Sequence, residues 1–354
     1  ELRELLTRDA VKTALQATHL GDDYRPLAEV IDEKAIVNGI VGLLATGGST
    51  NHTIHLVAIA AAAGIQIDWQ DFSELSGVIP QLSRVYPNGS ADVNHFHAAG
   101  GLGFIISDML ENGLLHEDVN TILGPGLRHF CREPRVEDGA LQWSDVQGES
   151  LDDDILRPCA NPFSPEGGLR LVTGNIGRAI VKVSAVDPAH HAIKAPAVVF
   201  RSQQAFVDAF NNDELERDFV AVVTQQGPRA NGMPELHKLT PYLGVLQNRG
   251  FKVALLTDGR MSGASGKVLA AIQVTPEAVD GGKIALIRDG DMVTIDAGSG
   301  ELSLDDAAAL EQREAEANGD GGQTGMGREL FAAFRERATG AEQGASLFGT
   351  RGDR

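Results

Sequence analysis

The chain has 354 residues, of which 42% are hydrophobic, and its 49 acidic and 30 basic residues give a formal net charge of −19. This length allows two domains, and the acidic excess disfavours nonspecific binding to nucleic-acid phosphates. No apolar run reaches the roughly 18 residues that a membrane-spanning helix needs. The only cysteines, Cys131 and Cys159, fit neither a zinc nor a CxxC pattern, so we expect a reducing, cytoplasmic setting.

The first part of the chain, residues 1–155, is predicted to be mostly helical with short turns. An apolar helix is expected over 36–45, and the glycine pair that follows should end it. A second helix is expected to begin after a Ser49-Thr50-Asn51 cap and to end at Gly64. Further helices are expected around 71–84 and 103–115.

From about residue 158 the sequence becomes rich in short strand-like runs: LRLVTG, AIVKVSAV, APAVVF, DFVAVVT, FKVALLTD, KIALIRDG and MVTIDA. One section has a strand–helix–strand pattern, which favours parallel strands: the strand DFVAVVT, then a helix over PELHKLTPYLGVLQNRG, then the strand FKVALLTD. The acidic, proline-containing stretch 152–168 shows no periodicity, so we place a boundary there between domains 1–157 and 158–354. Beyond about 315 we expect a surface loop, a helix over 328–338 and a loose end.

The stretch LLTDGRMSGASGK, residues 255–267, follows a predicted strand. A phosphate-binding Walker loop would need Gly where Met261 stands, and a nucleophile elbow around Ser262 would need Gly where Arg260 and Ala264 stand. A glycine-rich turn at the end of a parallel strand can still present backbone N–H groups to a ligand. A merely tight turn is the alternative interpretation.

The stretch QGPRANGMPELHK, residues 226–238, also follows a predicted strand, so it should lie at the same sheet edge as LLTDGRMSGASGK. Pro234 favours a helix start, which would put Glu235 in the first turn, either as a favourable acid or as a metal ligand. His237 and Lys238 directly after it could supply cationic donors to an anion.

Two histidine-containing stretches remain. In LLATGGSTNHTIHL, Ser49 and Asn51 lie at a predicted helix N-terminus, where free N–H groups favour an anion, whereas His52 and His55 lack an HExxH zinc signature. In YPNGSADVNHFHAAGG, alternate spacing could place His95 and His97 on one side of an extended segment, for anion contact or, less favoured, metal binding. The residues taken alone predict an enzyme that acts on a small anionic molecule.

The chain resembles the dihydroxy-acid dehydratase / 6-phosphogluconate dehydratase family in four motifs. In chain order, these are ATGGSTNHTIHL, FSPEGGLRLVTGNIG, QGPRANGMPELHK and LTDGRMSGASGK. Three further stretches resemble the 6-phosphogluconate branch of the family: VYPNGSADVNHFHAAGG, GLLHEDVNT and the His-Lys pair after GMPEL. The resemblance covers nearly the whole chain.

The resemblance implies a hydro-lyase that converts 6-phospho-D-gluconate, a phosphorylated sugar acid, to 2-dehydro-3-deoxy-6-phosphogluconate in the Entner–Doudoroff pathway. It implies a 4Fe-4S cluster as Lewis acid and a homodimer. The implied architecture is α/β: the C-terminal part of an α/β N-terminal domain over 1–157, followed by a swivelling, β-barrel-like domain over 158–354.

Carried over by position, Ser262 matches the serine proposed as the base that takes the proton α to the carboxylate. Glu235 matches a carboxylate ligand of a divalent ion, for which Mg²⁺ is suited. The metal would hold the substrate carboxylate and C2 hydroxyl while the C3 hydroxyl leaves on iron, which gives an enol that tautomerises. Charge and neighbourhood, without a matched motif, indicate further contacts for the phosphate and carboxylate ends: Arg229, His237, Lys238 and His95, with Ser49 and Asn51 at the helix start.

This sequence departs from the family in one respect, because the family's cluster cysteines lie in an N-terminal portion that it does not contain. Cys131 and Cys159 lie outside those motifs and cannot supply three cluster ligands. We therefore expect the chain to be the C-terminal part of the enzyme, inactive and without a cluster when alone. Two alternatives remain: a dihydroxy-acid dehydratase, or a non-catalytic subunit that binds a sugar-acid phosphate.

Overall fold

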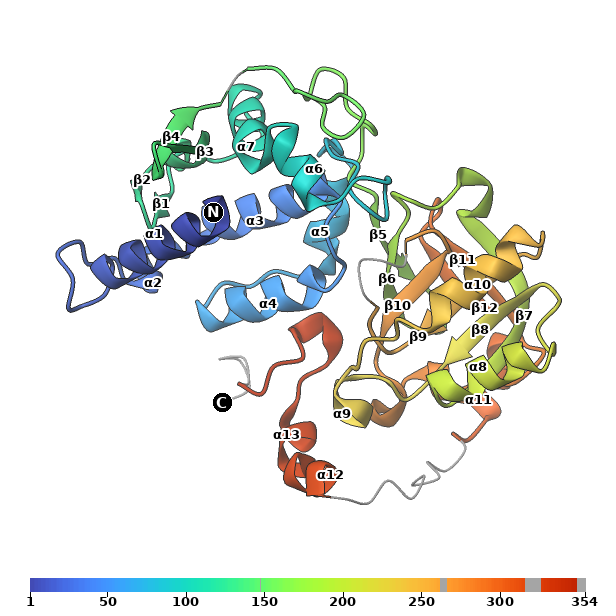
Figure 1. The fold of residues 1–354 in the computed structure, drawn as a ribbon. Coiled ribbons are helices and arrows are strands. Elements are labelled where there is room, and N and C mark those ends of the chain that lie inside the picture. The colour runs from blue at the N-terminus through green and yellow to red at the C-terminus, as the bar shows by residue number, and fades with distance from the viewer. Residues whose placement is uncertain (147, 262–265, 316–325, 349–354) are drawn as a thin grey trace. The chain divides into compact units, whose positions relative to one another are not determined.

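A computed structural model describes residues 1–146, 148–261, 266–315 and 326–348 (Figure 1). Its contacts divide the chain into two compact units. Unit 1 comprises residues 1–48, 63–65 and 75–167, and unit 2 comprises residues 49–62, 66–74 and 168–354. The expected domain boundary between residues 157 and 158 stays a prediction, since contacts alone do not show which segments fold independently.

Unit 1 is mainly helical, as predicted. Its core lies along α3, where Ile36, Ile40 and Leu44 are buried on one side of the helix. The Asp32 side chain accepts a hydrogen bond from the Ala35 N–H at the start of α3, and Gly47 ends the helix with φ 60°. The helices of unit 1 are α1 (Leu2–Gln16), α2 (Leu27–Val30), α3 (Glu33–Thr46), α6 (Val93–Ala98), α7 (Gly101–Glu111) and a 3₁₀ turn (Leu127–Phe130).

The sequence prediction for unit 1 missed a β-hairpin. Strands β3 (Arg132–Glu137) and β4 (Ala140–Asp145) pair in antiparallel fashion around Asp138 and Gly139, both of which have positive φ. An Asp-Gly pair is the usual signal for this two-residue turn, so the hairpin could have been found from the sequence. A second, two-residue pair joins β1 (Asn120–Thr121) and β2 (Gly124–Pro125).

Three further predictions were wrong in their details. The helix expected over 71–84 is α5 (Trp69–Ser76), because Gly77 and Pro80 do not continue a helix. His95 and His97 lie in helix α6 and not in an extended segment, because the Asp92 side chain caps that helix. KIALIRDG forms a 3₁₀ helix (Lys283–Leu286) in place of a strand.

Unit 2 contains a closed eight-stranded barrel, which confirms the predicted α/β class with a barrel-like second part. Around the barrel, the order is β10-β6-β5-β12-β11-β7-β8-β9. Strands β7, β8, β9 and β10 pair in parallel, as the strand–helix–strand pattern predicted for β8 and β9. The strands are β5 (Leu169–Thr173), β6 (Arg178–Lys182), β7 (Ala192–Phe200), β8 (Phe219–Val223), β9 (Val253–Thr257), β10 (Ala270–Thr275), β11 (Met292–Asp296) and β12 (Glu301–Leu304).

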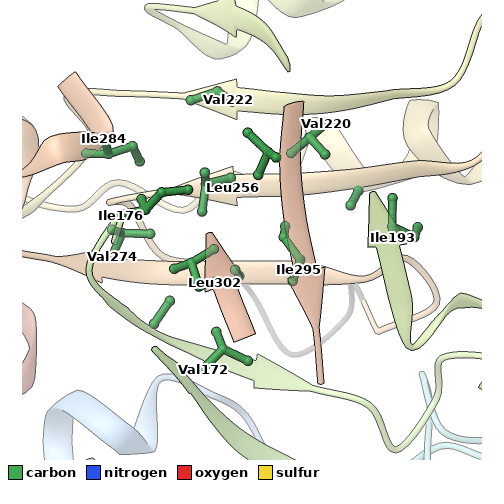
Figure 2. Packing of buried hydrophobic residues seen from close by; sticks show 14 of the residues in the cluster. Val172, Ile176, Ile193, Val220, Val222, Leu256, Val274, Ile284, Ile295 and Leu302 are labelled. Atoms are coloured by element: carbon green, nitrogen blue, oxygen red, sulfur yellow. The ribbon is translucent and has the colours of Figure 1, made fainter. Parts of the chain in front are cut away.

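The barrel interior is filled by alternate residues of these strands. Figure 2 shows Val220, Val222, Leu256 and Ile295 among the buried side chains that pack there. Ile284 belongs to the same cluster although it comes from the 3₁₀ helix that was predicted as a strand. The intervening residues of β8 and β9 face outward and are covered by α8 (Gln203–Asn211) and α10 (Leu239–Asn248), so both strands are buried on both faces.

Unit 2 also contains several helices, of which α8 and α10 pack on the barrel. The helix predicted over 328–338 is divided into α12 and α13. No helix in the described part of the chain is long and apolar enough to cross a membrane. The helices are α4 (His52–Ala62), α8 (Gln203–Asn211), α9 (Pro228–Asn231), α10 (Leu239–Asn248), α11 (Ala307–Gln312), α12 (Met326–Leu330), α13 (Ala332–Arg337) and 3₁₀ turns at Pro188–His190, Ala278–Asp280, Lys283–Leu286 and Ala341–Gln343; α5 passes from unit 2 to unit 1 after Glu74.

A buried carboxylate, that of Glu277, organises the loop after β8. It accepts hydrogen bonds from the backbone N–H groups of Arg229 (2.8 Å) and Ala230 (3.1 Å) in the first turn of α9. A Cβ at Gly227 would lie 2.2 Å from Glu277 Oε2, so this approach requires glycine. Burial is the main reason that the pKa of Glu277 rises to about 7, and the nearby carboxylates of Asp258 and Asp280 add to it.

The raised pKa of Glu277 predicts a pH-dependent stability. Because its pKa in the folded state lies above that of the unfolded chain, its contribution is complete below the unfolded pKa of 4.5 and is lost as the pH rises through about 7. The free energy of unfolding of the unmodified protein should fall by about 2 kcal/mol relative to Glu277→Gln between pH 4.5 and pH 8. Urea titrations at both pH values measure this difference. Parallel pH dependences in the two proteins would contradict the assignment.

Candidate functional site

Three segments of unit 2 that are far apart in the sequence meet at the carboxyl edge of the parallel strands. Arg260 follows β9, Glu235 lies in the loop between α9 and α10, and Asn51 lies just before α4. Glu235 and Arg260 also form an isolated parallel β-bridge. The prediction that the two loops after β8 and β9 share one edge is therefore confirmed.

The Glu235 carboxylate is the centre of this cluster. Its Oε1 atom accepts a hydrogen bond from Arg260 at 2.6 Å and from Asn51 Nδ2 at 2.9 Å. The Arg260 side chain also donates from Nε to the Met233 carbonyl at 2.6 Å, and its own carbonyl accepts from the Leu236 N–H at 3.1 Å. Because Glu235 is 34% exposed and Arg260 27% exposed, solvent and ligands can still reach the ion pair.

Asn51 carries an unsatisfied group. Its Oδ1 atom is buried and has no hydrogen-bond partner among the described residues. A buried amide oxygen without a partner is costly, so a donor or a cation from a bound molecule would be favourable there. The Ser49 hydroxyl accepts a hydrogen bond from the Asn51 N–H at 3.2 Å, which fixes the turn before α4.

Buried polar contacts hold the start of α4 against the barrel. Thr53 donates from Oγ1 to Gln273 Oε1 at 2.8 Å, and Gln273 Nε2 donates to the Thr50 carbonyl at 3.2 Å. Gln273 lies in β10 with φ 60°, and its N–H donates to the Gly259 carbonyl beside Arg260. The same residue thus positions two of the three segments of the site.

Three other predicted substrate contacts lie in unit 2, namely His237, Lys238 and Arg229, and they differ in their surroundings. His237 and Lys238 are exposed beside Glu235, and His237 Nδ1 lies 3.3 Å from the Glu235 carbonyl. The Arg229 side chain is held by Asp280 at 2.7 Å and by the Ala338 carbonyl at 2.8 Å. His237 and Lys238 are therefore better placed than Arg229 to meet a ligand.

Two predicted site residues are not tested by these contacts. His95 lies in unit 1, where its Nδ1 atom is 2.8 Å from Asp92 Oδ1 at the start of α6. Ser262 lies outside the described residues, so its role stays a prediction. Conversely, sequence reasoning did not single out Arg260, although an arginine directly after a strand that ends in Asp-Gly was a usable signal.

The described residues do not fit an iron–sulfur cluster. Cluster ligands are thiolates, whereas burial raises the pKa of the Cys131 thiol, and burial together with Asp108 raises that of Cys159 to about 12. No group of three or more His, Cys, Asp or Glu side chains among the residues described could hold a metal ion. Glu235 alone, already paired with Arg260, does not make a complete Mg²⁺ site either.

Comparison with known families and proteins covers almost all of the chain. Residues 1–130 match the family model "Dihydroxy-acid/6-phosphogluconate dehydratase N-terminal" and residues 154–345 match its C-terminal counterpart. The chain is 60% identical over 348 residues to a phosphogluconate dehydratase of Pseudomonas aeruginosa, covering 98% of this chain and 57% of that protein.

Two other relatives show how the similarity is distributed within the family. A phosphogluconate dehydratase of Escherichia coli K12 is 54% identical over 347 residues, covering 98% of this chain and 58% of that protein. A dihydroxy-acid dehydratase of Sulfurisphaera tokodaii is 37% identical over 280 residues, covering 78% of this chain and 47% of that protein. The chain thus spans 57–58% of the length of the two phosphogluconate dehydratases. It belongs to the dihydroxy-acid/6-phosphogluconate dehydratase family.

Proposed function

We propose that the complete protein is a hydro-lyase that dehydrates 6-phospho-D-gluconate to 2-dehydro-3-deoxy-6-phosphogluconate in the Entner–Doudoroff pathway. The observation that carries this proposal is the 60% identity to a phosphogluconate dehydratase over 98% of the chain, against 37% identity over 78% for a dihydroxy-acid dehydratase. We further propose a cytoplasmic homodimer. Any 4Fe-4S cluster would take its ligands from outside these 354 residues, since the two cysteines do not fit it.

The cluster around Glu235 suits one end of such a substrate. Arg260 and Lys238 offer positive charge to a carboxylate, and His237 offers a ring nitrogen for a hydrogen bond. The unpartnered Asn51 Oδ1 atom can accept a hydrogen bond from a substrate hydroxyl. In this proposal Ser49 and Asn51 contact the substrate. Arg229 and His95 remain proposed contacts of its anionic ends, and Glu235 remains a proposed ligand of Mg²⁺ together with groups from the rest of the protein.

The proposed reaction removes one proton and one hydroxide from neighbouring carbons. Ser262, as an alkoxide, takes the proton from C2, and the electrons of that C–H bond form the C2–C3 double bond as the C3 hydroxyl departs as hydroxide. The hydroxide takes up the proton from Ser262 and leaves as water, which restores the alkoxide. The resulting enol tautomerises to the 2-keto acid. Serine is a weak base, so positive charge and backbone N–H groups around it must stabilise the alkoxide.

Substrate preference tests the proposed function against the alternative within the family. The complete protein should turn over 6-phosphogluconate with a kcat/KM at least about 100-fold above that for 2,3-dihydroxyisovalerate, because the latter lacks a phosphate group. Steady-state assays with both substrates measure the ratio. A reversed ratio would establish the dihydroxy-acid dehydratase reading, and turnover of neither substrate would favour a non-catalytic binding subunit.

Replacing the proposed base, Ser262→Ala, should lower kcat by about 100- to 10,000-fold with little change in substrate affinity. Stopped-assay kcat values and calorimetric binding of 6-phosphogluconate measure the two quantities separately. Unchanged kcat would remove Ser262 from the mechanism.

Replacing the central carboxylate, Glu235→Gln, should lower kcat/KM by about 100-fold, because it removes the charge that pairs with Arg260 and, in the proposal, ligates Mg²⁺. Glu216→Gln is the matched control, since Glu216 pairs with Arg249 at 2.7 Å on the exposed surface of the same unit. Activity measured over a Mg²⁺ titration separates the two roles. If Glu235 is a ligand of Mg²⁺, the variant should need a higher Mg²⁺ concentration for half-maximal activity. If that concentration is unchanged, loss of the ion pair with Arg260 accounts for the whole decrease in kcat/KM.

A further inference from the structure

Gln273 of β10 has an unusual backbone for a strand residue. It is fully buried, and its φ of 60° lies in the left-handed region that residues other than glycine rarely adopt. The pairing of β10 with β6 changes register between Ile272 and Thr275, where three positions in β10 are matched by two in β6. This segment of β10 therefore contains a β-bulge, which turns a side chain away from the regular alternation of the strand.

The bulge removes Gln273 from the apolar packing of the barrel. Strict alternation would put it on the interior side together with Ala271. Instead, Ala271 and Val274 both belong to the buried interior cluster, and Gln273 is the extra residue between them. A buried amide and a left-handed backbone each destabilise a fold unless other contacts compensate. Their coincidence at one residue beside the site points to a role other than packing.

The Gln273 side chain binds the start of α4. Its Oε1 atom accepts from the Thr53 hydroxyl at 2.8 Å, and its Nε2 atom donates to the Thr50 carbonyl at 3.2 Å. We call these two hydrogen bonds the amide bridge. The reverse orientation of the amide would set Oε1 against the Thr50 carbonyl, which is also an acceptor. The amide bridge thus holds the chain on both sides of Asn51.

The rest of α4 is held by other contacts. Ile54 and Val57 are buried along the helix. The buried Trp69 side chain donates from Nε1 to the Thr53 carbonyl at 3.0 Å. Loss of the Gln273 amide should therefore displace the first turn of α4 without releasing the helix from the barrel.

The backbone of Gln273 acts on a different segment of the site. Its N–H donates to the Gly259 carbonyl at 2.8 Å, directly before Arg260. A substitution that changes only the side chain keeps this donor. The effect of the side chain on Asn51 can therefore be measured separately from the effect of the backbone on Arg260.

We propose that Gln273 is a positioning residue for the dehydration, which acts through Asn51. The amide bridge sets the first turn of α4 so that Asn51 Nδ2 meets the Glu235 carboxylate at 2.9 Å. This contact leaves Asn51 Oδ1 as an acceptor for a substrate hydroxyl. The inference rests on the proposed function. Because small displacements of a contacting group have large effects on rate, Gln273 controls turnover without touching the substrate.

The test is Gln273→Met in the complete protein, since methionine keeps the length of glutamine and has no amide. We expect kcat/KM for 6-phosphogluconate to fall by about 10- to 100-fold. Asn51→Ala should lower it by at least as much. In the double variant the loss should not exceed that of Asn51→Ala, because Gln273 acts through Asn51. Losses that multiply in the double variant overturn the proposal.

Asn175→Leu is the matched control. The Asn175 amide also makes two hydrogen bonds within the barrel, from Nδ2 to the Leu304 carbonyl at 2.7 Å and from the Leu304 N–H to Oδ1 at 2.8 Å. Leu304 lies in β12, a strand that carries no residue of the Glu235 cluster. This variant should have a lower urea midpoint and a kcat/KM within about twofold of the unmodified protein. An equal loss of kcat/KM in both variants contradicts a specific role of Gln273.

Thr53→Val removes one bond of the amide bridge from the opposite side and preserves the shape of the side chain. It should lower kcat/KM in the same direction as Gln273→Met and by a smaller factor. Urea midpoints establish which variants fold, and Thr53→Val replaces Gln273→Met in the double-variant test if the latter does not. An unchanged kcat/KM in the folded variants overturns the proposal.

Hydrogen–deuterium exchange separates a failure of this inference from a failure of the proposed function. The N–H groups of Thr53, Ile54 and His55 bind the carbonyls before them in the first turn of α4. Their exchange should be at least about 10-fold faster in Gln273→Met and unchanged in Asn175→Leu. Unchanged exchange in Gln273→Met overturns the amide bridge itself, with or without activity. Faster exchange in a protein that does not turn over 6-phosphogluconate supports the bridge and refutes the proposed function.

Discussion

The Asp258 side chain lies fully buried at the end of β9, and its carboxylate accepts hydrogen bonds from the N–H groups of Gln225, Gln226 and Ala278. These three donors belong to the loops after β8 and β10, so one carboxylate ties together the loops that flank the β9 turn. Burial raises the pKa of Asp258, and the three N–H groups oppose that rise by stabilising the charged form. An asparagine would present an N–H₂ group to these donors and could not satisfy all of them.

The rest of the candidate site depends on this contact. Gly259 follows Asp258, and a Cβ there would lie 2.7 Å from Gln226 Cβ and from Leu236 Cδ1, so the loops can approach only around glycine. The close approach brings Arg260 to the Glu235 carboxylate and places Gln226 beside Arg201 and Thr224. The Glu235 cluster therefore depends on how tightly these loops pack at the carboxyl edge.

Positively charged side chains lie at this edge although the whole chain has a negative net charge. A formal net charge of −19 repels an anionic ligand at long range, although salt screens that repulsion beyond about 8 Å in physiological solution. Arg260 and Lys238 nevertheless lie at this edge, next to the Glu235 carboxylate and in its loop. Short-range, charge-assisted hydrogen bonds from such groups can outweigh a screened long-range repulsion.

Local sequence patterns determined much of the architecture. The glycine after α3, the strand–helix–strand pattern around β8 and β9, and the family motifs were all readable without coordinates, because each depends on residues close together in the chain. Where several local signals competed, the prediction failed. Ile284 lies in a 3₁₀ helix and Ile287 directly follows it; both belong to the buried cluster of the barrel, and their apolar run looked like a strand. Only the tertiary structure decided which of the motif residues meet. Asn51 and Glu235 are 184 positions apart, and no local periodicity encodes their hydrogen bond, because it forms only where the segment before α4 packs against the loop after β8.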